Sequence, residues 1–220
     1  MAFPITHLLV AGALLGRIPG YEDTDATQFM LGALAPDAVH YREGFVGAAM
    51  KNIGHAKKVT HLCPISDERW GAVTDNEGWV KCVQAWLKSN TGPLAKGYAV
   101  HALTDIYNNM TLWECLRTRH PAEAAAGYAS DYYRDLKEID LRLYLSHFKG
   151  TKLERLLESA EPCDMPGLVT AGELGAIRDN ILYENYNGRT PAAGYEYTFL
   201  TYDETLKFIE DAVSAVEGWL

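Results

Sequence analysis

One histidine and one carboxylate are spaced so that a helix would bring them together. His101 and Asp105 lie four residues apart in an apolar segment that contains Val100, Leu103 and Ile106. Residues i and i+4 share one face of an α-helix, so this imidazole and this carboxylate converge. Nitrogen and oxygen donors of this kind bind zinc. Because buried ions need partners, a hydrogen-bonded His–Asp pair inside the core is the alternative, and the spacing alone leaves both interpretations open.

Two further histidines share a local sequence, since His7 and His61 each follow a threonine and precede a leucine. Each lies among apolar residues, as a metal ligand at the edge of a core would, or as a hydrogen-bonded core or cap histidine would. Asp37 directly follows Pro36, which restricts the backbone at that point, although an aspartate there is also typical of an ordinary turn. Together, three histidines and two aspartates in apolar settings supply the donor set that zinc prefers.

Five donors can form one closed site or, with Asp105 as a bridge, two adjacent sites. Zinc lowers the pKa of a bound water to about 7, which makes hydroxide available at neutral pH. Two-metal centres suit phosphoester hydrolysis because the attacking and the leaving oxygen both need stabilisation. The donor set therefore predicts a metal-dependent hydrolase that uses a metal-bound hydroxide, with a phosphoesterase as the leading interpretation.

Residues beside the Asp37 turn are candidate substrate contacts. Tyr41 and Arg42 follow it closely, and an arginine can hold a phosphate through two hydrogen bonds. We predict Arg42 and Tyr41 as substrate-binding residues, with an ordinary surface arginine as the alternative. Lys57 and Lys58 are expected to be solvated.

The order of these motifs resembles that of a known family. The motifs are THL at 6–8, FMLGALAPD at 29–37, THL at 60–62, and GYAVH at 97–101 followed by Asp105. Their order and approximate spacing resemble the bacterial zinc-dependent phospholipase C family, which is all-α and distantly related to single-strand-specific zinc nucleases. The resemblance covers residues 1 to about 116 and is weaker beyond them.

The resemblance implies a role for each donor. His61, His101 and Asp105 would hold one zinc ion, and His7 would hold a second zinc with Asp105 as the bridge. Asp37 would lie beside the first ion, either as a ligand or as the catalytic base that orients the attacking water. A nearby carboxylate can accept the proton of such a water.

The chain departs from that family in two places. Secreted members bind metal through a mature N-terminal tryptophan, whereas this chain begins with Met1-Ala2-Phe3 and shows no cleavable signal. They also use a later histidine and an HxxxE pair for another zinc, and no HxxxE follows Asp105. Glu138 and Asp140 are possible substitutes, but we expect no complete third site. The resemblance therefore implies a reduced, intracellular relative with one or two metals, zinc or another divalent ion.

Length, composition and charge exclude several classes of protein. The 220 residues suffice for one sizeable core, and residues 1–220 are predicted to form a single domain because no repeat or linker divides them. A hydrophobic content of 48% with 22% charged residues excludes a disordered chain. A net charge of −9 argues against broad nucleic-acid binding.

The cysteines and the apolar segments give a prediction for localisation. The four cysteines form no CxxC signature, so reduced thiols are expected. The longest apolar stretch, residues 5–15, is too short to span a membrane, and no Lys or Arg precedes it as in a signal peptide. We therefore expect a cytoplasmic protein without a transmembrane segment, whose partner is a small-molecule or lipid phosphoester.

Helical periodicity predominates and strand signals are scarce. The fold class is therefore predicted as all-α, a single-domain multi-helix bundle of the zinc-dependent phospholipase C type. The predicted helices cover residues 4–15, 25–34, 74–89, 94–116, 121–144, 152–159, 170–186 and 202 to the C-terminal end, with a loop-rich connection over 36–58. The tyrosines and acids of residues 132–144 either line an active-site wall or pack a helix with a solvated face.

Two other functions remain as alternatives. A hydrolase of amide or carboxylic ester bonds would use the same hydroxide. A non-catalytic protein that retains the fold would bind a metal or another ligand without turnover. Open coordination positions on the metal distinguish a catalytic site from a structural one.

Overall fold

The chain is helical throughout the part that the computed structural model describes. That part comprises residues 3–18, 21, 23–45, 51–64 and 70–220, with residues 51–55 described by their backbone alone. Within it, a single β-bridge between Met165 and Val169 lies outside any strand, so the all-α prediction is confirmed. Met1 and Ala2, which carry the predicted N-terminal departure, lie outside the described residues, as do residues 46–50 of the predicted loop.

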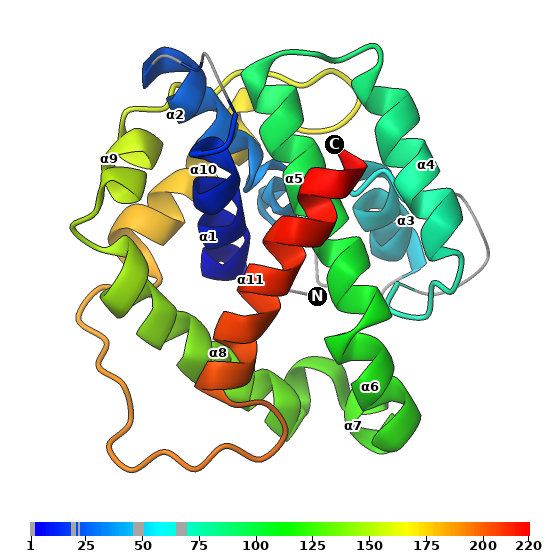
Figure 1. Cartoon of the computed structure of the whole chain (residues 1–220), viewed down its shortest axis with the longest axis vertical. Helices are drawn as coiled ribbons and strands as arrows, with labels where there is room; N and C mark the ends of the chain where they lie inside the picture. Colours follow the sequence, from blue (N-terminus) through cyan, green and yellow to red (C-terminus); the bar gives the residue numbers. More distant parts are fainter. Residues whose placement is uncertain (1–2, 19–20, 22, 46–50, 65–69) are drawn as a thin grey trace.

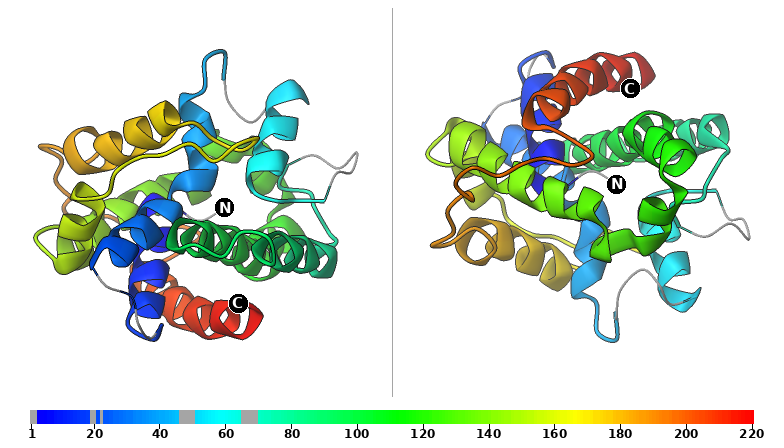
Figure 2. Two further views of the ribbon diagram at one scale, coloured as in Figure 1. Left: turned by 90° about the horizontal axis from the view of Figure 1, so that it is seen from above. Right: turned by 90° about the horizontal axis from the view of Figure 1, so that it is seen from below.

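A long helix, α5 (Pro93–Met110), runs through the middle of the molecule (Figure 1). The helix α11 (Tyr202–Trp219) packs on one side of α5, while the 3₁₀ helix η1 (Ala35–Tyr41) and α3 (Lys51–Thr60) lie on the opposite side (Figure 2). The N-terminal helices α1 (Pro4–Leu15) and α2 (Asp23–Gly32) also contact α5. None of the described helices is long and apolar enough to cross a membrane.

The remaining helical elements surround this centre. They are α4 (Asn76–Leu87), α6 (Leu112–Arg119), α7 (Pro121–Ala126), η2 (Gly127–Ala129), α8 (Asp131–Leu143), η3 (Tyr144–Phe148), α9 (Lys152–Glu158), α10 (Ala171–Asp179) and η4 (Asn180–Glu184). Of these, η2 is a 3₁₀ turn, whereas η3 and η4 are π-helical turns that continue α8 and α10.

Two glycines let α2 and α5 touch backbone to backbone. A Cβ added at Gly97 would lie 1.9 Å from the carbonyl oxygen of Phe29, and one added at Gly32 would lie 2.2 Å from a backbone oxygen of α5. No side chain fits at either position without separating the helices. This crossing places Ala33, the residue after α2, against His101, whose Nδ1 lies 2.7 Å from the Ala33 carbonyl oxygen.

The prediction of a loop over residues 36–58 is wrong where the structure describes that segment. Residues Ala35–Tyr41 form η1, and residues Lys51–Thr60 form α3. Pro36 occupies an early position of η1, where a missing N–H costs little. The sequence prediction used this proline as the end of a helix, whereas it lies at the start of one. The preceding helix, α2, correspondingly ends at Gly32 rather than at residue 34.

Two long predicted helices are each interrupted. The helix predicted over 94–116 breaks at Thr111, where φ is −119° and ψ is −91°. The helix predicted over 121–144 breaks at Gly127, whose φ of +55° is the left-handed conformation that favours glycine. The helix expected from Thr74 begins at Asn76, because Asp75 is the cap and its side chain accepts a hydrogen bond from the Gly78 amide at 2.8 Å.

The other helix boundaries agree closely with the sequence prediction. The first helix covers residues 4–15 as predicted, and Thr201 caps α11 with a capping box. Thr170 caps α10 in the same way, and α10 with its π-helical continuation covers most of the predicted segment 170–186. Local capping signals thus set these ends.

We predict that Gly97→Ala destabilises the protein by at least about 2 kcal/mol, because its methyl group would overlap a backbone carbonyl that cannot rotate away. Gly218→Ala, in a helical position with no heavy atom within 4 Å of the added Cβ, is the control and should stabilise by about 0.4–1 kcal/mol. Urea unfolding of both variants measures the difference. Equal stabilities would contradict the backbone contact between α2 and α5.

Candidate metal centre

Elements far apart in the sequence bring the five predicted donors into one buried cluster. Its members are His7 of α1, Asp37 of η1, His61 directly after α3, and His101 and Asp105 of α5. Asp37 has 8% of its surface exposed, and the other four have at most 1%. Two groups of three donors within this cluster are close enough to hold an ion.

The distances between donor atoms suit a small divalent ion. The Nε2 atom of His61 lies 3.4 Å from Oδ1 of Asp37 and 3.5 Å from Oδ2 of Asp105. The Nε2 atom of His101 lies 3.9 Å from Oδ2 of Asp37 and 3.8 Å from Oδ2 of Asp105. Tetrahedral zinc with bonds of about 2.0–2.1 Å separates its ligand atoms by about 3.3 Å. Each of the two imidazole nitrogens therefore lies at roughly ligand spacing from an oxygen of both carboxylates.

Two backbone carbonyls fix the histidine tautomers. Nδ1 of His61 lies 2.9 Å from the Lys57 carbonyl oxygen, and Nδ1 of His101 lies 2.7 Å from that of Ala33. A carbonyl only accepts, so each Nδ1 donates and each Nε2 of the neutral ring keeps a lone pair. Both Nε2 atoms are buried and have no hydrogen-bond partner among the described residues. Metal-bound histidines have this arrangement, with one ring nitrogen on a carbonyl and the other on the ion.

His7 faces the other oxygen of Asp105. Its Nε2 lies 3.4 Å from Oδ1 of Asp105, and its ring stacks on the ring of His101 with centroids 3.6 Å apart. Within the described part of the chain, neither ring nitrogen of His7 forms a hydrogen bond. Asp105 thus presents Oδ1 to His7 and Oδ2 to His61, as a bridging carboxylate would.

The protonation states in the cluster suit metal binding. Burial raises the pKa of Asp105, but His7 and the other histidines outweigh it and hold that pKa below its ordinary value. Burial likewise raises the pKa of Asp37. The neighbouring groups, of which Lys57 has the largest effect, outweigh burial and hold that pKa well below the usual range. Burial lowers the pKa of His101 and of His61. Ionised carboxylates and neutral imidazoles are the forms that ligate metals.

Lys57 is a member of the cluster that the sequence prediction missed. Its Nζ lies 3.0 Å from Oδ1 of Asp37 and 3.2 Å from Nε2 of His40, and 5.3 Å from the ring centroid of Trp70. Burial lowers its pKa, but Asp37 and Asp105 raise it above the ordinary value, so the ammonium stays charged. A buried cation therefore contacts one of the candidate ligands directly.

The expectation that Lys57 and Lys58 are solvated is wrong, because each is only 5% exposed. The helix α3 packs against η1, which covers this end of the helix. One local signal points to the role of Lys57: it lies four residues before His61, so the two side chains share a helix face.

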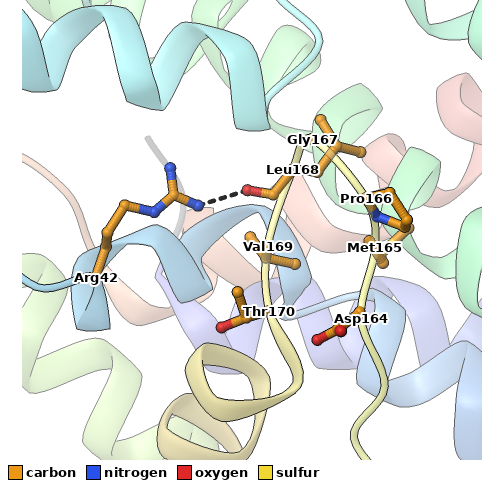
Figure 3. A pocket seen from close by; sticks show the side chains of 8 residues that line it. All are labelled: Arg42, Asp164, Met165, Pro166, Gly167, Leu168, Val169 and Thr170. Carbon is orange, nitrogen blue, oxygen red and sulfur yellow. Dashed lines mark hydrogen bonds between the residues drawn. The ribbon is translucent and has the colours of Figure 1, made fainter.

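Arg42 forms an ion pair with Glu173, and its side chain is still 37% exposed. Its Nε donates to Oε1 of Glu173 at 2.7 Å, and its Nη2 donates to Oε2 at 3.1 Å and also to the Leu168 carbonyl oxygen. Figure 3 shows the guanidinium pointing toward the loop of residues 164–170, which with Arg42 lines a cavity of about 450 Å³. Tyr41 is 40% exposed. A role for either residue in substrate binding stays a prediction.

The acids of residues 132–144 are held by the protein itself. Asp140 accepts hydrogen bonds from the Ile5 amide at 3.2 Å and from the Tyr186 hydroxyl. Glu138 accepts from Nε of Arg142 at 2.8 Å. Tyr132, Tyr133, Asp135, Asp140 and Tyr144 are buried, so these side chains pack inside the protein and do not form a solvated face.

Comparisons of the chain with protein-family models, with curated proteins and with solved structures found no match.

We predict that Asp140→Asn changes how stability depends on pH. Burial raises the pKa of Asp140 to about 7 in the folded protein, whereas an unfolded aspartate titrates near pH 4, at about 3.9. Between these values the folded protein binds more protons than the unfolded chain. Relative to the variant, the free energy of unfolding of the wild-type protein therefore falls by about 1.4 kcal/mol per pH unit as pH rises from about 4 to about 7. Above about pH 7 this difference becomes constant.

Urea unfolding of both proteins at unit steps from about pH 5 to about pH 9 measures this difference. Asp131→Asn is the control, since Asp131 is on the same helix and its side chain is 49% exposed. The control should differ from the wild-type protein by a nearly constant amount. A similarly constant difference for Asp140→Asn would contradict the raised pKa.

Proposed function

We propose that this chain is a metal-dependent hydrolase, and more specifically a phosphoesterase of the zinc-dependent phospholipase C type. The observation that carries the proposal is the buried cluster itself. Unpartnered Nε2 atoms of three histidines face two ionised carboxylates across distances that suit an ion. A buried acceptor without a partner costs about 1–3 kcal/mol, and a bound cation would remove that cost.

The donor chemistry supports a divalent ion such as zinc, which imidazole nitrogen and carboxylate oxygen bind well. Asp37, His61 and His101 would hold it, with Asp105 beside the two histidines. A divalent ion in such a site lowers the pKa of water and polarises a phosphoryl oxygen. The carbonyls of Lys57 and Ala33 keep the two imidazole rings oriented toward the ion.

The cluster is accessible to solvent through Asp37. The side chain of Asp37 is 11% exposed, whereas those of His61 and Asp105 are at most 1% exposed. A substrate would therefore approach on the Asp37 side, where His40 is 31% exposed. The substrate class that this proposal implies is a small-molecule or lipid phosphoester.

A structural metal site is the second candidate. Four protein donors can complete a tetrahedron without water, and closed sites of this kind are structural. The burial of His61, His101 and Asp105 favours this alternative. The two functions differ in turnover, because a structural ion would change stability and leave phosphoesters intact.

We predict that Asp105→Asn lowers phosphoesterase activity by about a hundredfold or more, since removing even a residue that orients a ligand costs about 10–100-fold. Activity is measured on a panel of phosphomonoesters, phosphodiesters and phospholipids. Chelation should abolish turnover, and added Zn²⁺ should restore it.

Asp211→Asn is the matched control, since Asp211 is 45% exposed and pairs with Lys207 on the outside of α11. It should leave activity and zinc content unchanged. Turnover that persists in thoroughly metal-free protein would exclude the mechanism. Zinc that raises stability in a protein without turnover would favour the structural role.

We also predict that Asp37→Asn lowers zinc content and turnover together. The Asp37 oxygens lie at ligand-like distances of 3.4 and 3.9 Å from the two imidazole nitrogens. Its pKa lies well below the usual range, whereas an effective general base has a pKa near the working pH. Zinc per chain and kcat are measured side by side. Full zinc content with turnover lowered by about 10²–10⁴-fold would instead make Asp37 the base.

A further inference from the structure

The donors of the cluster share one histidine. Two groups can each hold a divalent ion, namely His7–His101–Asp105 and Asp37–His61–His101. His101 belongs to both groups. Its Nδ1 donates a hydrogen bond to the Ala33 carbonyl oxygen, so Nε2 is the one atom of this ring that can bind an ion. A single Nε2 lone pair binds one ion at a time. The described donors therefore cannot complete both groups together.

A protein cation already lies at the edge of this cluster. Nζ of Lys57 is 3.0 Å from Oδ1 of Asp37 and 3.2 Å from Nε2 of His40. Among the described residues, these two acceptors account for two of the three N–H donors of an ammonium. An anion that reaches Lys57 can accept the third.

The charges of the cluster fit one ion better than two. Asp37, Asp105 and Lys57 together carry one net negative charge while the imidazoles are neutral. One divalent ion changes this to one net positive charge, and a second ion would leave three positive charges in a buried site. Because an uncompensated buried charge is costly, the ammonium favours a single ion and leaves one positive charge for an anion.

Lys57 also lies on the more exposed side of the cluster. The side chains of His40, Asp37 and Lys57 are 31%, 11% and 6% exposed, whereas that of Asp105 is 1% exposed. A ligand that approached from this side would meet these residues before the inner donors. Its negatively charged end would meet the ammonium and the ion together.

We propose that the centre takes one divalent ion and that Lys57 supplies its second positive charge, binding an anionic oxygen of the ligand that the ion also holds. This inference rests on the proposed function in that the same donors bind the ion. It does not depend on turnover, so it can be tested by binding alone.

The test uses full-length protein loaded with Zn²⁺, and its readouts are zinc per chain and the affinity for inorganic phosphate in calorimetric titration. The wild-type protein should hold one zinc. Lys57→Met should keep that zinc and bind phosphate about ten- to hundredfold more weakly, the range for losing a hydrogen bond to a charged group. Lys57→Arg, which keeps the charge, should retain most of the affinity.

Lys58→Met is the matched control, because Lys58 is the neighbouring residue on α3 and is equally buried at 5% exposure. It should bind phosphate within about threefold of the wild-type protein, well short of the loss expected for a charged hydrogen bond. Lys57→Gln replaces the methionine variant if that variant does not fold.

The outcomes separate this inference from the proposed function. Two zinc ions per chain in the wild-type protein would overturn the single-ion centre. Zinc-loaded Lys57→Met with unchanged phosphate affinity would overturn the role of Lys57 and leave the proposed function standing. A wild-type protein that binds no zinc would overturn the proposed function and this inference with it.

Discussion

The hydrogen bond from His101 to the carbonyl of Ala33 is the constraint on which the cluster depends. It forms because Gly32 and Gly97 let α2 and α5 touch along their backbones. It fixes the His101 tautomer and turns an Nε2 lone pair inward, toward Asp105 one helical turn away. The protein thus holds a buried acceptor that no described residue satisfies. A cation that fills this position would couple metal binding to the stability of the fold.

The buried acids of α8 show what a satisfied carboxylate looks like in this protein. Asp135 accepts hydrogen bonds from the Tyr195 hydroxyl and from backbone amides of residues 198–200, and Asp140 accepts from Tyr186 and Ile5. These contacts join α8 to the loop before α11 and to the start of α1. The carboxylate of Asp105 instead faces imidazoles, with Oδ1 3.4 Å from Nε2 of His7 and Oδ2 3.5 Å from Nε2 of His61. The acids of α8 thus join separate elements of the fold, whereas Asp105 lies among the histidines of the cluster.

Local signals in the sequence predict most of the helices and only part of the cluster. Thr170 and Thr201 carry their capping hydroxyls in the sequence, so the starts of their helices could be predicted. The break at Thr111 has no comparable residue signal. Spacing alone could pair His101 with Asp105, but the approach of the other donors depends on how separate helices pack. Their residue types and apolar settings, together with the motif resemblance, suggested that approach without fixing its geometry. The burial of Lys57 depends on the packing of α3 against η1, which no local pattern encodes.

The two basic side chains near η1, Arg42 and Lys57, make different kinds of contact, and the chemistry of each side chain explains the difference. The planar guanidinium of Arg42 forms a two-bond ion pair with Glu173, which ties the end of η1 to α10. An ammonium is a compact charge on a flexible stem, so Lys57 can hold Asp37 and still turn a donor toward a ligand. Because Arg42 anchors one end of this short helix, Asp37 near its start is held where Lys57 and the imidazoles meet it. Arg42 thus fixes the end of η1 against α10, and Lys57 holds the carboxylate near the start of the same helix.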